Sequence, residues 1–374
     1  MSSNIFNLLE ILENIFKYLS IEQLENLCKD SQFGHVALHA LIIHKFHEVN
    51  NNDLKTKNRK TRHLQINKFA NYEELSSFYS LRSLYISDQQ LPSEIASEIV
   101  KLTKLRSLNV GFNNLQSEGA IKISKMGSLK YLNILNNNLD QDAVTQIIKM
   151  NNLKHLAIGM NGLIHSNITE ITKMTNLESL DISGPPIENF RISDLAGMNN
   201  LKSLNVSCMY LHHYNICDVS KLFSLESLDI SNNELVPLSI RQINKIPNLK
   251  KLNISNNDLW RDKLKFGEML NLRWLNISGN RITEDDIEDI YNLKNLTYLD
   301  ASHNRIWCIH PNIFRLENLV DLNLSHNDLV YGGIPNMTYM KNLRSFDISG
   351  HNYSESDKAV FRNMYIKGPL KIKI

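Results

Sequence analysis

Hydrophobic positions recur along most of this chain at a nearly constant spacing. From 249 to 259 the sequence reads LKKLNISNNDL, in which Leu249, Leu252, Ile254 and Leu259 are apolar and Asn257 precedes the last of them. The alternation at Leu252 and Ile254 predicts a short strand with one buried face. The same pattern starts at twelve leucines, spaced by 24 residues or twice by 23: Leu81, Leu105, Leu129, Leu153, Leu177, Leu201, Leu225, Leu249, Leu272, Leu296, Leu319 and Leu343.

One such unit cannot bury its own apolar edge, so the copies must stack. The pattern L-x-x-L-x-L-x-x-N-x-L resembles the leucine-rich-repeat family from about Leu81 to Tyr353. The resemblance implies an α/β solenoid, a curved horseshoe of about twelve repeats with a parallel sheet on its concave face. The recurring asparagine should form a buried ladder between coils, interrupted where Pro185 and Met209 replace it. Its predicted members are Asn113, Asn137, Asn161, Asn233, Asn257, Asn280, Asn304 and Asn327.

The first 48 residues do not follow the repeat. Apolar residues at steps of three and four predict an amphipathic helix, followed by two more short helices. From Leu8 to Phe33 the string LLEILENIFKYLSIEQLENLCKDSQF resembles the F-box, although Leu9 stands where that family has proline. The alternative is that these helices only cap the open end of the solenoid. The resemblance assigns contact with a ubiquitin-ligase adaptor to Leu8, Leu9, Ile11, Leu12, Ile15, Phe16, Leu19 and Leu24.

Four parts are therefore predicted. Residues 1–48 form an F-box-like helical domain, 49–62 a basic polar linker, 63–353 the repeat solenoid and 354–374 a C-terminal cap. The linker composition is typical of a solvated segment, with a nuclear-localisation signal as the alternative. Within these parts, residues 63–69 predict a degenerate first strand, and residues 365–374 predict a closing strand or a hairpin.

Composition narrows the classes of function. Lys and Arg total 41 against 39 Asp and Glu, so no nucleic-acid partner is expected. The four cysteines lack metal-type spacing and do not flank the repeats in pairs, which favours a cytoplasmic or nuclear protein over a secreted receptor. Neither a signal peptide nor an apolar run of membrane-spanning length is evident. The Asn- and Lys-rich composition is typical of AT-rich genomes, including those of viruses and intracellular bacteria whose proteins could act in a host cytoplasm.

No catalytic motif stands out. A Gly-rich phosphate loop, a G-x-S-x-G turn and an H-E-x-x-H pair are all missing from the sequence, so we expect no enzyme activity, metal or cofactor. His303 and His326 occupy the same repeat position on adjacent coils, and their side chains should lie close together. A neutral surface role for this histidine pair is favoured over a metal site.

Side chains beside the buried strand residues should face the concave surface and bind a partner protein. Most repeats carry Asn, Asp and Ser there, and these small polar side chains give a partner little contact surface. Exposed aromatic and basic residues, the types enriched in binding hot spots, break this pattern in two patches. The first patch comprises Tyr85, Phe112, Tyr131, Leu135, His155 and Met160. The second patch comprises Lys251, Arg273, Trp274, Tyr298, His303 and His326.

A protein-interaction module follows from this organisation, monomeric apart from its complex and without a membrane partner. The F-box resemblance implies a substrate receptor of an SCF-type cullin–RING ubiquitin ligase, in which the N-terminal helices bind the adaptor and the solenoid holds the target. The alternative is a leucine-rich-repeat scaffold or inhibitor whose N-terminal helices are only a cap.

Overall fold

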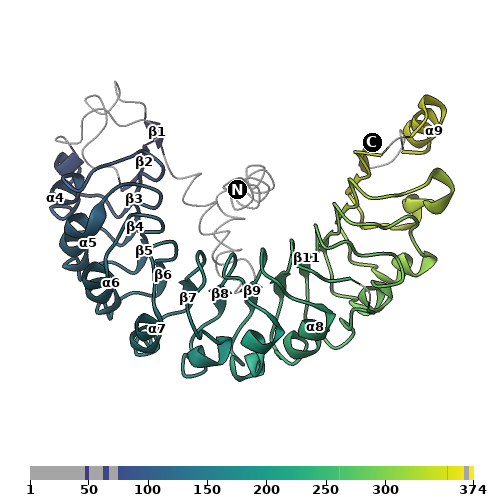
Figure 1. Cartoon of the computed structure of the whole chain (residues 1–374). Helices are drawn as coiled ribbons and strands as arrows, with labels where there is room; N and C mark the ends of the chain where they lie inside the picture. Colours follow the sequence, from purple (N-terminus) through teal and green to yellow (C-terminus); the bar gives the residue numbers. More distant parts are fainter. Residues whose placement is uncertain (1–46, 50–61, 67–74, 261, 352, 366–369) are drawn as a thin grey trace. The chain divides into compact units, whose positions relative to one another are not determined.

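The computed structural model describes residues 47–49, 62–66, 75–260, 262–351, 353–365 and 370–374. The chain divides into two compact units, residues 1–163 and 164–374. Both are built from stacked coils, each with a short strand on one side and a helical or irregular segment on the other (Figure 1). No helix in the described ranges is long and apolar enough to cross a membrane.

The described residues of the first unit include six strands that pair in parallel in sequence order. They are β1 (His47–Val49), β2 (His63–Ile66), β3 (Ser83–Tyr85), β4 (Ser107–Asn109), β5 (Tyr131–Asn133) and β6 (His155–Ala157). The segments opposite the strands are η2 (Leu75–Ser77), α4 (Ile95–Ile99), α5 (Gln116–Ser124) and α6 (Gln141–Ile148).

The second unit has the same kind of arrangement, with nine parallel strands among its described residues. They are β7 (Ser179–Asp181), β8 (Ser203–Asn205), β9 (Ser227–Asp229), β10 (Lys251–Asn253), β11 (Trp274–Asn276), β12 (Tyr298–Asp300), β13 (Asp321–Asn323), β14 (Ser345–Asp347) and β15 (Lys371–Lys373). Its α-helices are α7 (His165–Ile171), α8 (Pro237–Ile243) and α9 (Glu355–Tyr365). Most other coils carry 3₁₀ turns: η3 (Ile192–Leu195), η4 (His213–Ile216), η5 (Val219–Lys221), η6 (Glu288–Asn292), η7 (Pro311–Arg315), η8 (Tyr331–Gly333) and η9 (Met337–Tyr339).

Strands β3 to β14 occupy the twelve predicted repeat registers, so the solenoid with a parallel sheet is confirmed. Strand β2 is the predicted degenerate first strand. Strand β1 was not predicted: it pairs with β2 in a stretch that the sequence assigns to the helical domain and the linker. At the other end β15 pairs in parallel with β14, which makes it a closing strand and not half of a hairpin. The F-box-like string lies outside the described residues.

Columns of apolar side chains form the core of each unit. The central leucines of neighbouring strands lie in register, as Leu252 does with Leu275 and Leu275 with Leu299. These three side chains are at most 2% exposed. Because each leucine packs against the leucines of the coils on either side, its apolar area is buried only when the coils stack.

Buried asparagines connect the coils on the side where the strands end, as predicted. Asn280 is fully buried. Its amide Nδ2 donates to the Ile254 carbonyl in the preceding coil at 3.0 Å and to the Ile277 carbonyl in its own coil at 3.0 Å. Its Oδ1 accepts from the Asn257 backbone N–H at 3.0 Å. One side chain therefore satisfies three backbone groups in a dry interior.

The same pattern recurs at all eight predicted positions, and it is absent at Pro185 and Met209. In the last coil His351 takes the place of asparagine. Its Nε2 accepts from the Asn327 N–H at 3.1 Å, and its Nδ1 lies 2.7 Å from the Ile348 carbonyl oxygen. Nδ1 must therefore carry the proton, because the carbonyl can only accept.

A second series of asparagines, which the sequence analysis did not identify, connects the coils where the strands begin. Each stands immediately before the first leucine of its repeat and donates to a carbonyl of the preceding coil. Asn295 Nδ2, for example, lies 2.9 Å from the Leu270 oxygen. The other members are Asn152, Asn200, Asn248, Asn271, Asn318 and Asn342. A coil that carries both asparagines is thus bonded to the preceding coil at both ends of its strand.

Removing a single ladder amide should weaken the fold measurably. Asn257 donates to the Ile230, Ile254 and Ser255 carbonyls. Asn257→Ala leaves these buried carbonyls without that donor, so the free energy of unfolding should fall by about 1–3 kcal/mol. Urea denaturation followed by circular dichroism measures the change. The matched control is Asn199→Ala, an exposed asparagine, which should stay within about 0.5 kcal/mol. Equal effects from both variants would contradict the ladder.

Acid should weaken the last coil through His351. Burial lowers the pKa of this imidazole, and the charge of His326 lowers it further. The unfolded chain therefore binds the proton more readily than the folded chain. Its contribution to stability is present above about pH 6.5 and is lost as the pH falls through that value toward the lower pKa of the folded state.

His351→Asn removes the titrating group and keeps one donor and one acceptor at the same place. Urea unfolding between pH 7.5 and 5 should therefore show a smaller loss of stability for the variant than for the unchanged chain. Identical pH dependence in the two proteins would show that His351 is not part of the ladder.

Candidate partner-binding surface

Two side chains of each strand face the open side of the sheet, on either side of the buried leucine. In β10 they are Lys251 and Asn253, which flank Leu252. We call the first and third residues of strands β7–β14 the strand face of the second unit. The strands line the inner side of the arc that this unit forms, and the helices and 3₁₀ turns lie on its outer side (Figure 1).

The first strand residue is serine in β7, β8, β9 and β14. In the four strands between β9 and β14 it is a charged or aromatic residue instead. These four residues, called here the central row, are Lys251, Trp274, Tyr298 and Asp321. They are direct neighbours in the sheet register. The Trp274 and Tyr298 rings stack with centroids 5.0 Å apart and planes 6° from parallel.

The aromatic pair is more buried than the sequence suggests. Trp274 and Tyr298 are each only 9% exposed, so the prediction that they are exposed is wrong. Their ring faces cover one another, since residues in register on neighbouring strands are only about 4.8 Å apart. Each ring can therefore present little more than an edge to a partner.

Charged groups flank the aromatic pair on both sides. Burial lowers the pKa of Lys251 to about 8. Burial, together with the charges of Asp300 and Asp347, raises the pKa of Asp321 to about 6. Arg273, which precedes β11, is exposed and forms no ion pair within the described ranges. These groups place cations at one end of the central row and an anion at the other.

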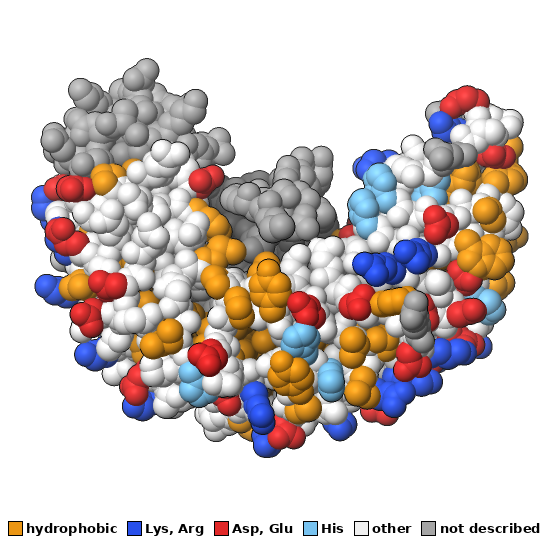
Figure 2. All heavy atoms as spheres, viewed as in Figure 1, with side chains coloured by type: hydrophobic (Ala, Val, Ile, Leu, Met, Phe, Trp, Pro, Cys, Tyr) orange, Lys and Arg blue, Asp and Glu red, His pale blue; other side chains and the backbone are white. Residues whose placement is uncertain are grey.

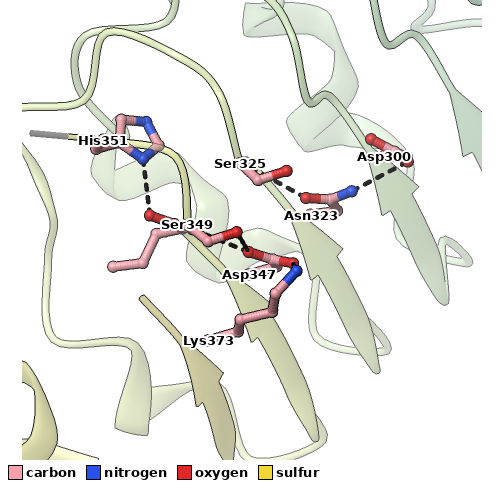
Figure 3. Close-up of polar contacts among 8 residues, drawn as sticks. Asp300, Asn323, Ser325, Asp347, Ser349, His351 and Lys373 are labelled. Atoms are coloured by element: carbon pink, nitrogen blue, oxygen red, sulfur yellow. Dashed lines mark hydrogen bonds and ion pairs between the residues drawn. The ribbon is translucent and has the colours of Figure 1, made fainter.

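The third strand residue closes a tight turn in coil after coil. Asp347 Oδ1 accepts from the Ser349 N–H at 2.9 Å and from the Ser349 hydroxyl at 2.7 Å. Asn323 accepts in the same way from the Ser325 N–H at 3.0 Å, as Figure 3 shows. Such Asx turns hold the backbone where the strand ends. We expected the serines of this series to face the partner, but Ser325 is only 6% exposed.

Neighbouring turns are bonded to one another across the strand face. Asn323 Nδ2 donates to Asp300 Oδ2 at 3.2 Å, and Lys373 Nζ lies 2.9 Å from Asp347 Oδ2 (Figure 3). Two further pairs follow the same rule, Asn205 with Asp181 and Asn253 with Asp229, each at 2.9 Å. The Asn and Asp side chains are therefore engaged in a lateral ladder and are held in place before any partner arrives.

The predicted patch of the first unit is only partly exposed. Tyr85 stacks on Tyr131 at 6.3 Å, and Tyr131 meets His155 at 6.0 Å. Tyr85 and Leu135 are only 5% and 6% exposed, so they present less surface to a partner than we predicted. Burial also raises the pKa of Tyr85. Tyr131 and His155 remain half-buried on the strand face of this unit.

The eighth residue of every repeat has a left-handed backbone. Phe112 and Met160 both have φ of 57°, and His303 and His326 both have φ of 53°. Residues with a Cβ adopt this conformation at a cost of about 1 kcal/mol. The conformation recurs because the chain turns inward here, toward the position that the ladder asparagine occupies in most repeats. Asn, Gly and His therefore recur here for backbone reasons.

The His303 and His326 rings stack 4.4 Å apart and 10° from parallel, which confirms their predicted proximity. Burial and the His326 charge lower the pKa of His303. Nitrogens of two parallel stacked rings do not converge on a common point, which disfavours joint metal binding. In the parts of the chain that the structure describes, no cluster of three or more His, Cys, Asp or Glu side chains could hold a metal ion.

Comparison with known families agrees with this geometry. Residues 35–268 match the family model described as a leucine-rich repeat region, and residues 247–306 and 270–329 match the leucine rich repeat model. The chain belongs to the leucine-rich-repeat family. No curated protein matches it.

Two solved structures resemble this leucine-rich-repeat protein in fold. An internalin from Listeria monocytogenes has 21% identity and a TM-score of 0.53, covering 81% of this chain and 88% of its own. A leucine-rich-repeat protein from Leptospira interrogans has 19% identity and a TM-score of 0.53, covering 88% of this chain and 100% of its own. At this level of identity the likeness shows the shared solenoid fold alone.

The proposed adaptor contacts lie outside the described residues of this leucine-rich-repeat protein. All eight belong to the F-box-like string: Leu8, Leu9, Ile11, Leu12, Ile15, Phe16, Leu19 and Leu24. The matched leucine-rich-repeat region begins at residue 35, after that string.

Several exposed aromatic residues were missed because they lie on connecting segments and not on strands. Trp307 is 52% exposed, Tyr210 63% and Tyr339 71%. Trp260 lies on such a segment too, with the Arg281 guanidinium 5.9 Å from its ring centre. Figure 2 shows hydrophobic side chains gathered among charged ones and histidines along an edge of the second unit. The repeat pattern carries no signal for them, since it constrains only the buried positions.

Proposed function

We propose that this protein is an interaction scaffold that captures a partner protein on the strand face of its second unit, over β10–β13. The observation that carries the proposal is the central row. At the same register the flanking strands β7, β8, β9 and β14 have serine, whereas these four strands have Lys, Trp, Tyr and Asp. Stacked solenoid coils create the kind of extended surface that repeat proteins use for binding.

The strand face is suited to binding because it is already ordered. Asx turns and the lateral Asn–Asp ladder fix the side chains around the central row. A partner therefore does not have to immobilise them, which reduces the entropic cost of association. A packed aromatic pair with charged groups at its rim also has the composition typical of a hot spot.

Arg273 is the most suitable residue for testing this surface. Truncating Trp274 or Tyr298 would remove buried packing and cost about 3 kcal/mol, so a loss of binding could reflect a weakened fold. Arg273 is exposed, and Arg273→Glu should leave the fold intact. We expect at least a tenfold loss of affinity for the natural partner, about 1.4 kcal/mol.

The partner is first identified by cross-linking to the unchanged protein, and its affinity for each variant is then measured by calorimetry. Arg344→Glu is the matched control, because Arg344 is an exposed arginine at the same repeat position before β14. Retention of full affinity by Arg273→Glu, or equal losses in both variants, would refute capture over β10–β13.

We further propose that the scaffold is a substrate receptor of an SCF-type cullin–RING ubiquitin ligase. The support is the F-box-like string between Leu8 and Phe33, which resembles the adaptor-binding domain of such receptors. Holding a target beside the ligase would raise the effective concentration of its lysines near the conjugating enzyme. A scaffold or inhibitor without a ligase is the alternative.

Leu8→Ala combined with Leu9→Ala tests the ligase proposal. Because adaptor contact would depend mainly on apolar area, the double variant should no longer co-purify with adaptor and cullin, while partner capture on the strand face persists. Deleting residues 1–48 is a poorer test, since β1 (His47–Val49) is paired with β2. If the unchanged protein binds no adaptor, the protein is a scaffold or inhibitor.

A further inference from the structure

The central row carries opposite charges at its two ends. Lys251 lies beside Trp274 in the register, and Tyr298 lies beside Asp321. The order across β10–β13 is therefore cation, aromatic, aromatic, anion. Three strand spacings of about 4.8 Å separate the two charged ends, which places them about 14 Å apart.

At the anionic end, Asp321 lies between two other carboxylates. Asp300 is on β12 and Asp347 on β14, and both raise the pKa of Asp321. Of the neighbouring donors, the Ser345 side chain hydrogen-bonds Asp321, Asn323 donates to Asp300 and Lys373 pairs with Asp347. Asp321 forms no ion pair with a cation of the described chain. An external ammonium or guanidinium group would relieve this repulsion.

At the cationic end, Lys251 is accompanied by Arg273. The neighbouring Lys250 is already paired with Glu226 at 3.0 Å, whereas Arg273 forms no ion pair within the described residues and is exposed. A carboxylate from a partner would pair with Arg273 at this end. One ligand that contacts both ends therefore needs a carboxylate at the Lys251 end and a cation at the Asp321 end. Between these two charges it needs an apolar group that covers the aromatic pair.

Resting on the proposed function, we infer that the partner contributes an extended segment with the pattern acidic–x–apolar–x–basic. In an extended chain, residues i, i+2 and i+4 point to the same side and span about 14 Å at about 3.4 Å per residue. That span equals the distance between the charged ends of the central row. The acidic side chain lies over Lys251 and Arg273, the apolar one over Trp274 and Tyr298, and the basic one over Asp321.

Binding of this segment should depend on pH in a bell-shaped manner. Asp321, with a pKa of about 6, loses its charge below that pH, and Lys251, with a pKa of about 8, loses its charge above that pH. Affinity should therefore be greatest between these values. The groups that face Asp321 are Tyr298 and Asp300 from β12 and Ser345 and Asp347 from β14, and those that face Lys251 are Ser227 and Asp229 from β9 and Trp274 from β11.

Three synthetic peptides of equal length test the pattern on the full chain. Their cores are Glu-Thr-Ile-Thr-Lys, the isomer Thr-Glu-Ile-Lys-Thr with its charges two residues apart, and Glu-Thr-Ile-Thr-Glu. Isothermal calorimetry at pH 7 should show the first binding at least tenfold more tightly than the other two. Asp321→Lys should reverse the preference, so that the doubly acidic peptide binds best. Ser203→Lys, at the same strand position on β8, is the control and should not reverse it.

The possible failures are distinguishable. If none of the peptides binds, or all bind equally, while Arg273→Glu still abolishes capture of the natural partner, the acidic–x–apolar–x–basic pattern is wrong and the proposed function stands. If Arg273→Glu leaves capture intact, the proposed function itself is wrong. An unchanged peptide preference in Asp321→Lys would likewise overturn the assignment of the basic side chain to Asp321.

Discussion

Satisfying the backbone inside the coils is the constraint on which the rest of this structure depends. Between strand and connecting segment the chain leaves N–H and C=O groups in a dry interior, where each unpaired group costs about 1–3 kcal/mol. Asn280 shows the solution, with its single amide bonded to a carbonyl of its own coil and to an N–H and a carbonyl of the preceding coil. Leucine packing supplies the apolar burial, and the parallel strand pairs set the register, which β7 and β8 keep without a ladder asparagine. The asparagines add side-chain hydrogen bonds from one coil to the next.

The same need to satisfy polar groups shapes the proposed binding surface. Asx turns at Asp300, Asn323 and Asp347 tie the strand ends to the turns that follow, and amides donated between strands link these turns laterally. Most polar side chains of the strand face are thereby engaged within the fold. On the strand face of the second unit the central row breaks this pattern, with the exposed Arg273 beside it. This contrast is the reason for placing the proposed binding surface over β10–β13.

Sequence periodicity predicts features that repeat from coil to coil. It predicts poorly those that depend on which particular side chains meet between adjacent coils. Leucine spacing located β3 to β14, and the recurring asparagine gave the ladder and its break at Pro185 and Met209. The burial of Trp274 and Tyr298 was missed, because each ring is covered by a neighbour 24 residues away. The left-handed turn at Met160 was missed for another reason, since backbone conformation leaves no hydrophobic pattern.

Amide hydrogen exchange tests the central claim, that ladder asparagines hold adjacent coils together, most directly. In the second unit, four backbone N–H groups at one repeat position donate to a ladder asparagine of the next coil, those of Leu211, Leu235, Ile282 and Ile306. Ile187 occupies the same position, but Met209 stands where that asparagine would be. The Ile187 amide should exchange at least a hundredfold faster than the four. Equal protection at all five amides would show that leucine packing alone holds the coils, and would contradict the ladder.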